Sequence, residues 1–115
     1  MNDSHYPWFI LVPDREHVTE IHQLESADQN QLIAESSILS GSIETVFDAD
    51  KINIAALGNI VPQLHIHHIV RYRTDAAWPA PVWGKTAARP YTDEQLLQIT
   101  GKLRSELNAD VEFLR

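Results

Sequence analysis

The chain has 115 residues, 43% of them hydrophobic, and its 16 acidic and 9 basic side chains give a net charge of −7. This length suits one compact domain, the acidic balance argues against a general binder of nucleic-acid backbones, and the absence of cysteine excludes disulfides and thiol chemistry. No apolar run approaches the length of a membrane span, and no signal peptide opens the chain, so we expect a cytoplasmic protein without a membrane partner.

Three strands and a long helix are expected in the first two thirds of the chain. An apolar run at 7–13 lies between two prolines, which predicts a buried strand. Ser26 and Gln29 have the spacing of a capping box, and the apolar periodicity beyond them predicts a helix over 26–48. Further strands are expected at 51–57 and 64–72, and their short connection favours an antiparallel hairpin.

The last third predicts a packed loop and a second helix. Residues 74–91 are rich in proline and contain two tryptophans, so we expect an ordered loop. Thr92 and Gln95 form a second capping box, which begins a helix over about 92–108. The element order predicts a single α+β domain with an antiparallel sheet. The expected core side chains are Phe9, Leu11, Ile33, Leu39, Val46, Phe47, Ile54 and Ile66.

Three of the six histidines lie between residues 65 and 68. Because side chains alternate along a strand, Gln63, His65 and His67 share one face and His68 points to the other. His68 is expected on the core side with one hydrogen bond. His65 and His67 could ligate a metal, take part in phosphoryl chemistry, or lie solvated on an open face. A metal site lacks a clear third ligand.

The segment NIAALGNIVPQLHIHHIVR, residues 53–71, resembles the signature of the histidine triad (HIT) superfamily. In that signature three histidines alternate with apolar residues on a strand, and an arginine follows. The element order extends the resemblance over residues 5–73, and the helix at 92–108 looks like the tail of a bacterial HIT-like branch. The resemblance implies an α+β fold with about five antiparallel strands, commonly paired into a homodimer.

Relatives in that superfamily usually carry one more strand, which precedes the segment matching residue 7 and walls the nucleoside pocket. This chain begins too late to contain that strand. We therefore expect either an open pocket or a true start upstream of Met1.

The resemblance also implies a reaction. HIT enzymes are nucleotide hydrolases and nucleotidyl transferases whose middle histidine attacks an α-phosphate and forms a nucleotidyl-histidine intermediate. In this sequence the middle histidine is His65, the third is His67, and Gln63 replaces the first. A neutral imidazole is nucleophilic near pH 7, and His67 could donate to a phosphate oxygen. Gln63 could orient a phosphate or be a plain surface residue.

Four further residues are candidates for binding the nucleotide or its phosphate. The resemblance places Asn53 near the phosphate and Asn2 at the edge of the nucleoside pocket. Asn59 follows a glycine, so it could be either a turn residue or a ligand-binding residue. Arg71 at the end of the histidine strand could meet a phosphate or be a solvated charge.

Trp8 is a departure from the family pattern, because many HIT enzymes have a further histidine at this position. A role in protonating the leaving group is then missing or moved to His5 or His17. The loop aromatics could stack on a base or be buried against the body of the protein; these are Trp78, Trp83 and Tyr91.

The resemblance implies two possible functions. The first is a HIT-type hydrolase or transferase of a dinucleoside polyphosphate or an adenylyl conjugate. The alternative is a nucleotide-binding module with weak or no turnover, and a histidine-based metal-binding protein ranks below both. No resident cofactor is expected, with Mg²⁺ only as a companion of a polyphosphate substrate. The expected partners are a nucleotide or nucleotide conjugate and a second copy of the chain.

Overall fold

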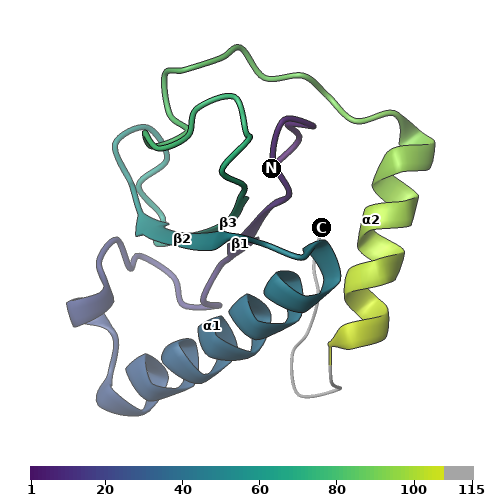
Figure 1. The fold of residues 1–115 in the computed structure, drawn as a ribbon. Helices are drawn as coiled ribbons and strands as arrows, with labels where there is room; N and C mark the ends of the chain where they lie inside the picture. The colour runs from purple at the N-terminus through teal and green to yellow at the C-terminus, as the bar shows by residue number, and fades with distance from the viewer. Residues whose placement is uncertain (108–115) are drawn as a thin grey trace.

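The computed structural model describes residues 1–107, which form a three-stranded antiparallel sheet with helices packed against it (Figure 1). The strand order is β1-β3-β2, so β3 is central. The α+β class is confirmed, whereas the expected count of about five strands is not, because the segments at 57–65 and 74–91 are loops. The elements are β1 (Trp8–Leu11), the 3₁₀ helix η1 (Ile21–Gln23), α1 (Ser26–Phe47), β2 (Lys51–Ala56), β3 (Ile66–Arg71) and α2 (Asp93–Glu106).

The two predicted helices form at the expected places but begin differently. α1 is preceded by Glu25 as its N-cap, without a side-chain cap. The Gln29 amide instead donates to the Leu24 carbonyl at 2.9 Å, so the capping box predicted at its start is wrong. The capping box of α2 is confirmed, since the Thr92 hydroxyl accepts from the Gln95 backbone N–H. The final residue of the predicted 92–108 helix lies outside the described residues. None of the helices in residues 1–107 combines the length and apolar character of a membrane span.

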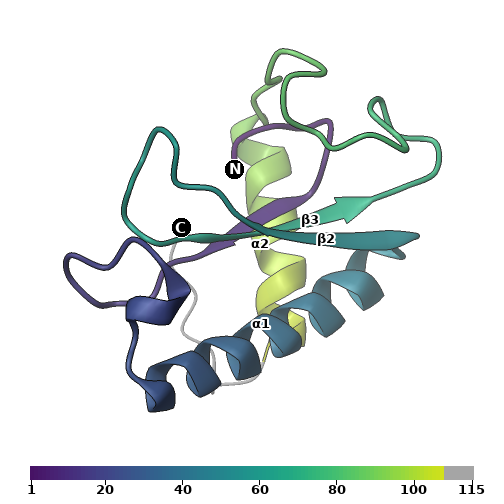
Figure 2. The same ribbon diagram turned by 90° about the vertical axis from the view of Figure 1, so that its left-hand side faces the viewer.

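One face of the sheet packs on α1, which lies beneath it in Figure 2. The even-numbered residues of β3 face this helix, so Ile66 packs near Leu32 and Val70 near Leu39 and Ile43. His68 lies on this core side, fully buried, as predicted. The corresponding stripe on α1 consists of Leu32, Ser36, Leu39 and Ile43, at spacings of three or four residues.

Two residues expected in the core lie on the surface. Ile33 is 62% exposed because it follows Leu32 and turns away from the buried stripe of α1. Ile54 is 54% exposed because β2 is an edge strand of the sheet. Val46 is half-buried. The remaining expected core residues pack in the clusters beside α1: Phe9, Leu11, Leu39, Phe47 and Ile66.

The other face of the sheet is covered by the N-terminal segment and the loop at 74–91, which lie above the strands in Figure 2. Arg71, which is 1% exposed, holds this loop in place. Its guanidinium donates to both carboxylate oxygens of Asp75, at 2.8 and 3.1 Å, and to the Ala80 carbonyl at 2.8 Å. Asp75 also accepts backbone N–H groups of the loop. This buried ion pair therefore sets the path of the chain after β3.

Asp75→Asn should lower the free energy of unfolding by about 3–5 kcal/mol, because it leaves the buried Arg71 charge without a counterion. The exposed pair of Arg15 and Asp28 is a matched control, and Asp28→Asn should cost less than about 1 kcal/mol. Urea unfolding of both variants measures the difference. Equal effects would show that Arg71 does not depend on Asp75.

The same pair predicts a loss of stability in acid. Burial alone would raise the pKa of Asp75, but the Arg71 and backbone hydrogen bonds hold that pKa below its ordinary value. The stabilisation by the ionised Asp75 carboxylate is fully present above the ordinary aspartate pKa of about 4. It is lost as the pH falls through the lower pKa that Asp75 has in the folded state. The Asp75→Asn variant should therefore show a smaller loss of stability on acidification than the wild type.

Ser36→Ala should lower the free energy of unfolding by about 1–3 kcal/mol, because it leaves a buried nitrogen of His68 without its partner. The His68 Nδ1–H donates to the Ile66 carbonyl at 3.1 Å, so Nε2 accepts from the Ser36 hydroxyl at 2.7 Å. Ser37→Ala is the control, since Ser37 is exposed on the same helix, and its effect should stay within about 0.5 kcal/mol. Thermal or urea unfolding compares the two; similar stabilities would contradict the role given to Ser36.

Candidate active site

His65 immediately precedes β3 and His67 is the second residue of this strand, and their side chains lie side by side, as the alternation of side chains predicts. Their ring centroids are 4.9 Å apart, and the rings meet edge to face at 72°. His65 is half-buried and His67 is 7% exposed. The two rings therefore pack against each other and are at least partly buried, and they do not lie on an open, fully solvated face.

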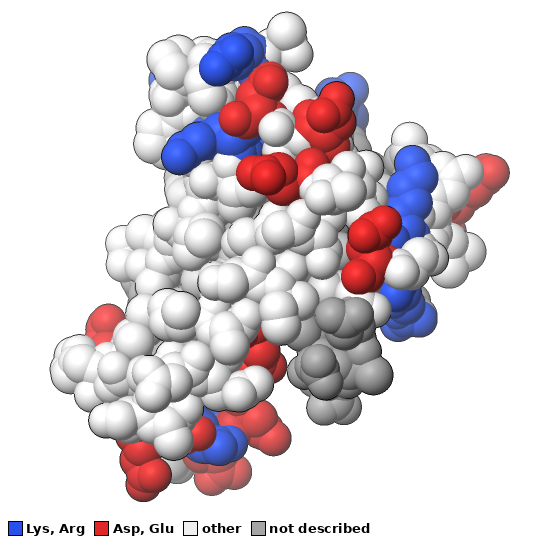
Figure 3. All heavy atoms as spheres, turned by 60° about the horizontal axis from the view of Figure 1, so that its bottom comes forward, with Lys and Arg blue, Asp and Glu red and all other residues white. Residues whose placement is uncertain are grey.

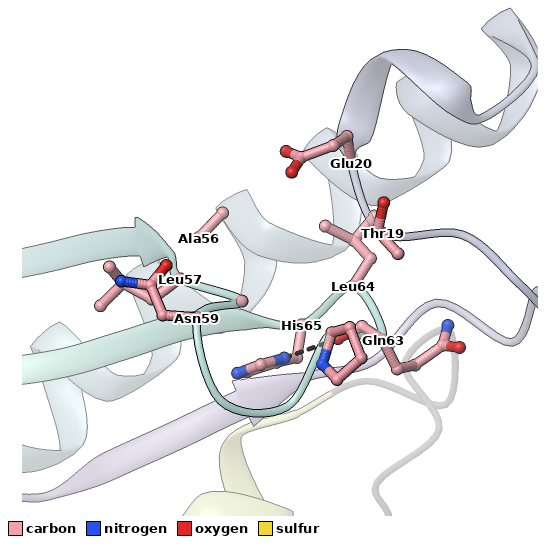
Figure 4. A pocket seen from close by; sticks show the side chains of 10 residues that line it. Thr19, Glu20, Ala56, Leu57, Asn59, Gln63, Leu64 and His65 are labelled. Carbon is pink, nitrogen blue, oxygen red and sulfur yellow. Dashed lines mark hydrogen bonds between the residues drawn. The ribbon is translucent and has the colours of Figure 1, made fainter.

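A backbone carbonyl determines which ring nitrogen of His65 carries the proton. Its Nδ1 lies 2.7 Å from the Gln63 carbonyl oxygen, drawn as a dashed line in Figure 4. A carbonyl can only accept, so Nδ1 carries the proton and Nε2 of the neutral ring keeps its lone pair. This is the form in which an imidazole attacks an electrophile.

A pocket of about 170 Å³ lies beside His65. The connection from β2 forms one wall of this pocket, and the segment before η1 contributes Thr19 and Glu20 (Figure 4). Asn59 lines the pocket together with His65. Thr19 and Glu20 were not predicted, because they belong to an irregular segment without a periodic pattern. The lining residues are Thr19, Glu20, Ala56, Leu57, Gly58, Asn59, Pro62, Gln63, Leu64 and His65.

His67 is held by two tryptophans. The Trp8 indole N–H donates to His67 Nδ1 at 2.9 Å, and the Trp83 ring meets the His67 ring edge-on, with centroids 5.2 Å apart. Burial, together with charge on His65, the N-terminal amine and His68, lowers the pKa of His67 to about 4. His67 is therefore neutral at physiological pH.

The Gln63 side chain does not join the histidine pair. Its amide donates to the Arg15 carbonyl at 2.9 Å, and Figure 4 shows it extending away from the His65 ring. Gln63 instead contributes its backbone carbonyl, which orients His65. The Gln63 side chain therefore stabilises the loop at residue 15.

Three residues expected to bind the nucleotide make other contacts in this structure. Arg71 donates to the Asn53 amide oxygen at 2.7 Å within the buried cluster around Asp75. Asn2 accepts the Tyr91 backbone N–H at 2.8 Å and so holds the loop before α2. The buried contacts of Arg71 and Asn53 do not support phosphate binding by either side chain, because both are already engaged in positioning the loop after β3.

The residues proposed to replace the missing histidine lie in separate places. His5 contacts the Asp3 carboxylate at 2.7 Å, and His17 is exposed in a turn. Neither has a contact with the histidine pair among the interactions of the described residues.

The loop aromatics differ in their surroundings. Trp78 lies under the Arg71 guanidinium, 5.5 Å from it, and the Tyr91 hydroxyl donates to the Tyr6 carbonyl at 3.1 Å. These contacts support burial for those two residues. Trp83 remains 39% exposed beside His67.

Metal binding finds no support in the arrangement of side chains. Within residues 1–107, no three His, Asp or Glu side chains lie together in a group that could hold a metal ion.

Comparison with known proteins identifies the family. Residues 1–74 match the HIT domain model. A histidine triad protein from Marinobacter aquaeolei VT8 is 52% identical, with a TM-score of 0.90 over 93% of this chain and 78% of that chain. A histidine triad protein from Sinorhizobium meliloti 1021 is 41% identical, with a TM-score of 0.91 over 93% and 79% of the two chains. One from Bradyrhizobium japonicum is 42% identical, with a TM-score of 0.90 over 92% and 79%. A search of curated proteins found no match. The chain therefore belongs to the histidine triad family, whose members generally act on nucleotides as hydrolases or transferases.

Proposed function

We propose that the protein is a nucleotide hydrolase or nucleotidyl transferase that attacks an α-phosphate through His65. The observation that carries this proposal is the hydrogen bond from His65 Nδ1–H to the Gln63 carbonyl, 2.7 Å long. It leaves Nε2 as the nucleophilic nitrogen on a ring that lines the pocket.

The reaction has two steps. His65 Nε2 attacks the α-phosphorus and forms a P–N bond, while the P–O bond to the leaving group breaks and its oxygen keeps the electron pair. The oxygen of water or of another acceptor then attacks the same phosphorus and forms a new P–O bond, releasing its proton to solvent. The P–N bond breaks, its electron pair returns to Nε2 of His65, and the nucleotide is released. In both steps the Nε2–H of His67 donates to a phosphoryl oxygen as charge develops there.

The pocket limits which part of the substrate is enclosed. Its volume of about 170 Å³ is below the range of about 300–1,000 Å³ that is usual for small-molecule sites. It suits a phosphate group, with Asn59 as a donor beside it, while the nucleoside extends beyond the pocket. A dinucleoside polyphosphate or an adenylyl conjugate fits this arrangement, and the site needs no resident cofactor.

The alternative is a nucleotide-binding module with weak or no turnover. The Gln63 side chain points to the Arg15 carbonyl and cannot become cationic, so the first triad position provides no positive charge for the phosphate. Product formation from a dinucleoside polyphosphate separates the two functions, since tight binding without product supports the module.

His65→Ala should abolish turnover and leave the fold and nucleotide affinity nearly intact, because the covalent step is lost and the pocket contacts remain. His67→Ala should slow the reaction by about 10²–10³, since it removes one oriented donor. Chromatographic separation of products from a dinucleoside polyphosphate gives both rates. His22→Ala is the matched control, because His22 is exposed in η1, and its rate should equal that of the wild type.

Acid-quench mass spectrometry provides the direct check on the nucleophile. The wild type should carry one nucleotidyl group on the peptide that contains residues 63–71. Gln63→His should raise turnover or leave it unchanged. Full activity of His65→Ala, or an adduct on His5 or His17, would overturn the assignment.

We also propose that the protein is a homodimer that uses the outer edge of β2. This edge has no partner strand within the described residues, and unpaired edges favour association. Ile54 of β2 pairs in register with His68 of β3. His68 in turn contacts Ser36 of α1, and Ile33 lies about one helical turn before Ser36. Both isoleucines are exposed. Figure 3 shows a broad surface without charged side chains on the side of the molecule where α1 lies.

Light scattering should give about twice the chain mass of 13.1 kDa. Ile54→Lys should shift the protein to the monomer, because it places a charge in the apolar contact. Leu97→Lys is the control, since Leu97 is also exposed, at 63%, but lies on α2. A wild-type mass of one chain at micromolar concentration would contradict the dimer.

A further inference from the structure

Trp8, His67 and Trp83 form a compact aromatic cluster beside the proposed nucleophile. Their ring centroids lie 5.6 Å apart for Trp8 and His67, 5.3 Å for the two tryptophans, and 5.2 Å for His67 and Trp83, and all three pairs meet edge-on. Trp8 is 6% and His67 is 7% exposed. Water therefore has little access to the side of His67 that faces Trp8.

Only one direction of hydrogen bonding is open to the Trp8–His67 pair. The indole nitrogen of tryptophan can donate but cannot accept. At 2.9 Å from Trp8 Nε1, His67 Nδ1 must therefore carry a lone pair. A neutral imidazole has one proton, so this proton lies on Nε2.

We propose that Trp8 is a positioning residue that fixes His67 as a neutral ring with its proton on Nε2. The tautomer itself follows from the contacts of Trp8, and only its consequence for turnover rests on the proposed function.

The electrostatic surroundings of His67 act in the same direction. The charged groups that act on it are His65, the N-terminal amine and His68, all of which are cations when protonated. Its neighbours across the sheet, Ile10 and Ala55, are uncharged. Together with burial, these groups lower the pKa of His67. Protonation of Nδ1 would also break the bond from Trp8, because the lone pair that accepts it would be lost.

The hydrogen bonds of the two rings place their protons on different nitrogens. The Gln63 carbonyl holds the proton of His65 on Nδ1, and Trp8 holds the proton of His67 on Nε2. One ring then offers a lone pair at Nε2 and the other offers an N–H at Nε2. Because an indole N–H does not titrate between about pH 5 and pH 8, whereas a histidine at this position would, the donor to His67 is independent of pH in that range.

Long-range ¹H–¹⁵N NMR of the wild-type protein without substrate tests the tautomer directly. His67 should show an unprotonated Nδ1 and a protonated Nε2, and neither shift should move between about pH 5 and pH 8. A protonated Nδ1, or a titration within this range, would overturn the proposal. The measurement needs no variant, so it stands even if substitution of the buried Trp8 impairs folding.

Trp8→Phe keeps an aromatic ring and removes the donor. It should raise the proton affinity of His67 about tenfold, or about one pKa unit, and allow the Nδ1–H tautomer to appear. Trp83→Phe is the matched control, because Trp83 touches the same ring without donating to it, and it should leave the tautomer and pKa of His67 unchanged. Equal effects of the two variants would show that ring packing, and not the hydrogen bond, positions His67.

The effect of Trp8 on turnover is measured by kinetics, independently of the NMR experiment. Trp8→Phe should reduce kcat by about tenfold with little change in KM, and His65→Ala should remove activity altogether. If the wild type forms no product from a dinucleoside polyphosphate, the proposed function fails and the NMR result still decides the tautomer. If the wild type is active and Trp8→Phe has an unchanged kcat, the positioning role fails and the proposed function remains.

Discussion

The burial of β3 on both faces is the constraint on which the rest of the structure depends. Every residue from Ile66 to Arg71 is buried, so the polar side chains of this strand must find their hydrogen-bond partners within the protein. The even positions pack against α1, where His68 needs Ser36 as a partner. The odd positions face the N-terminal segment and the loop after β3. His67 therefore lies within a strand that is buried on both faces, and His65 immediately precedes that strand.

Hydrogen bonds with only one allowed direction determine what the site can do. The Gln63 carbonyl can only accept, and the Trp8 indole can only donate, so the two rings carry their protons on different nitrogens. Neither constraint needs an additional charge beside the two rings. The two rings thus present different groups at Nε2, a lone pair on His65 and an N–H on His67.

The Arg71–Asp75 pair shows how a residue that matches a family motif can have a structural role. Arg71 ends the histidine strand, where the sequence left open whether it contacts a phosphate or is a solvated charge. Its side chain is buried, and Asp75, Asn53 and Ala80 occupy its donors. A buried guanidinium with a counterion is costly to expose, so Arg71 fixes the loop that brings Trp83 against His67.

Local patterns were sufficient to determine the α+β class, the extents of the helices, the α2 capping box, the shared face of His65 and His67 and the core position of His68. These features depend on periods of two and of about 3.6 residues and on short-range hydrogen bonds. Ile33 is exposed because it turns away from the buried stripe of α1, and Ile54 is exposed because β2 is an edge strand of the assembled sheet. The contacts of Trp8 with His67, of Gln63 with Arg15 and of Arg71 with Asn53 join residues 18 to 59 positions apart. Only the tertiary structure decided these contacts, because no local pattern encodes which distant group a buried donor or acceptor will meet.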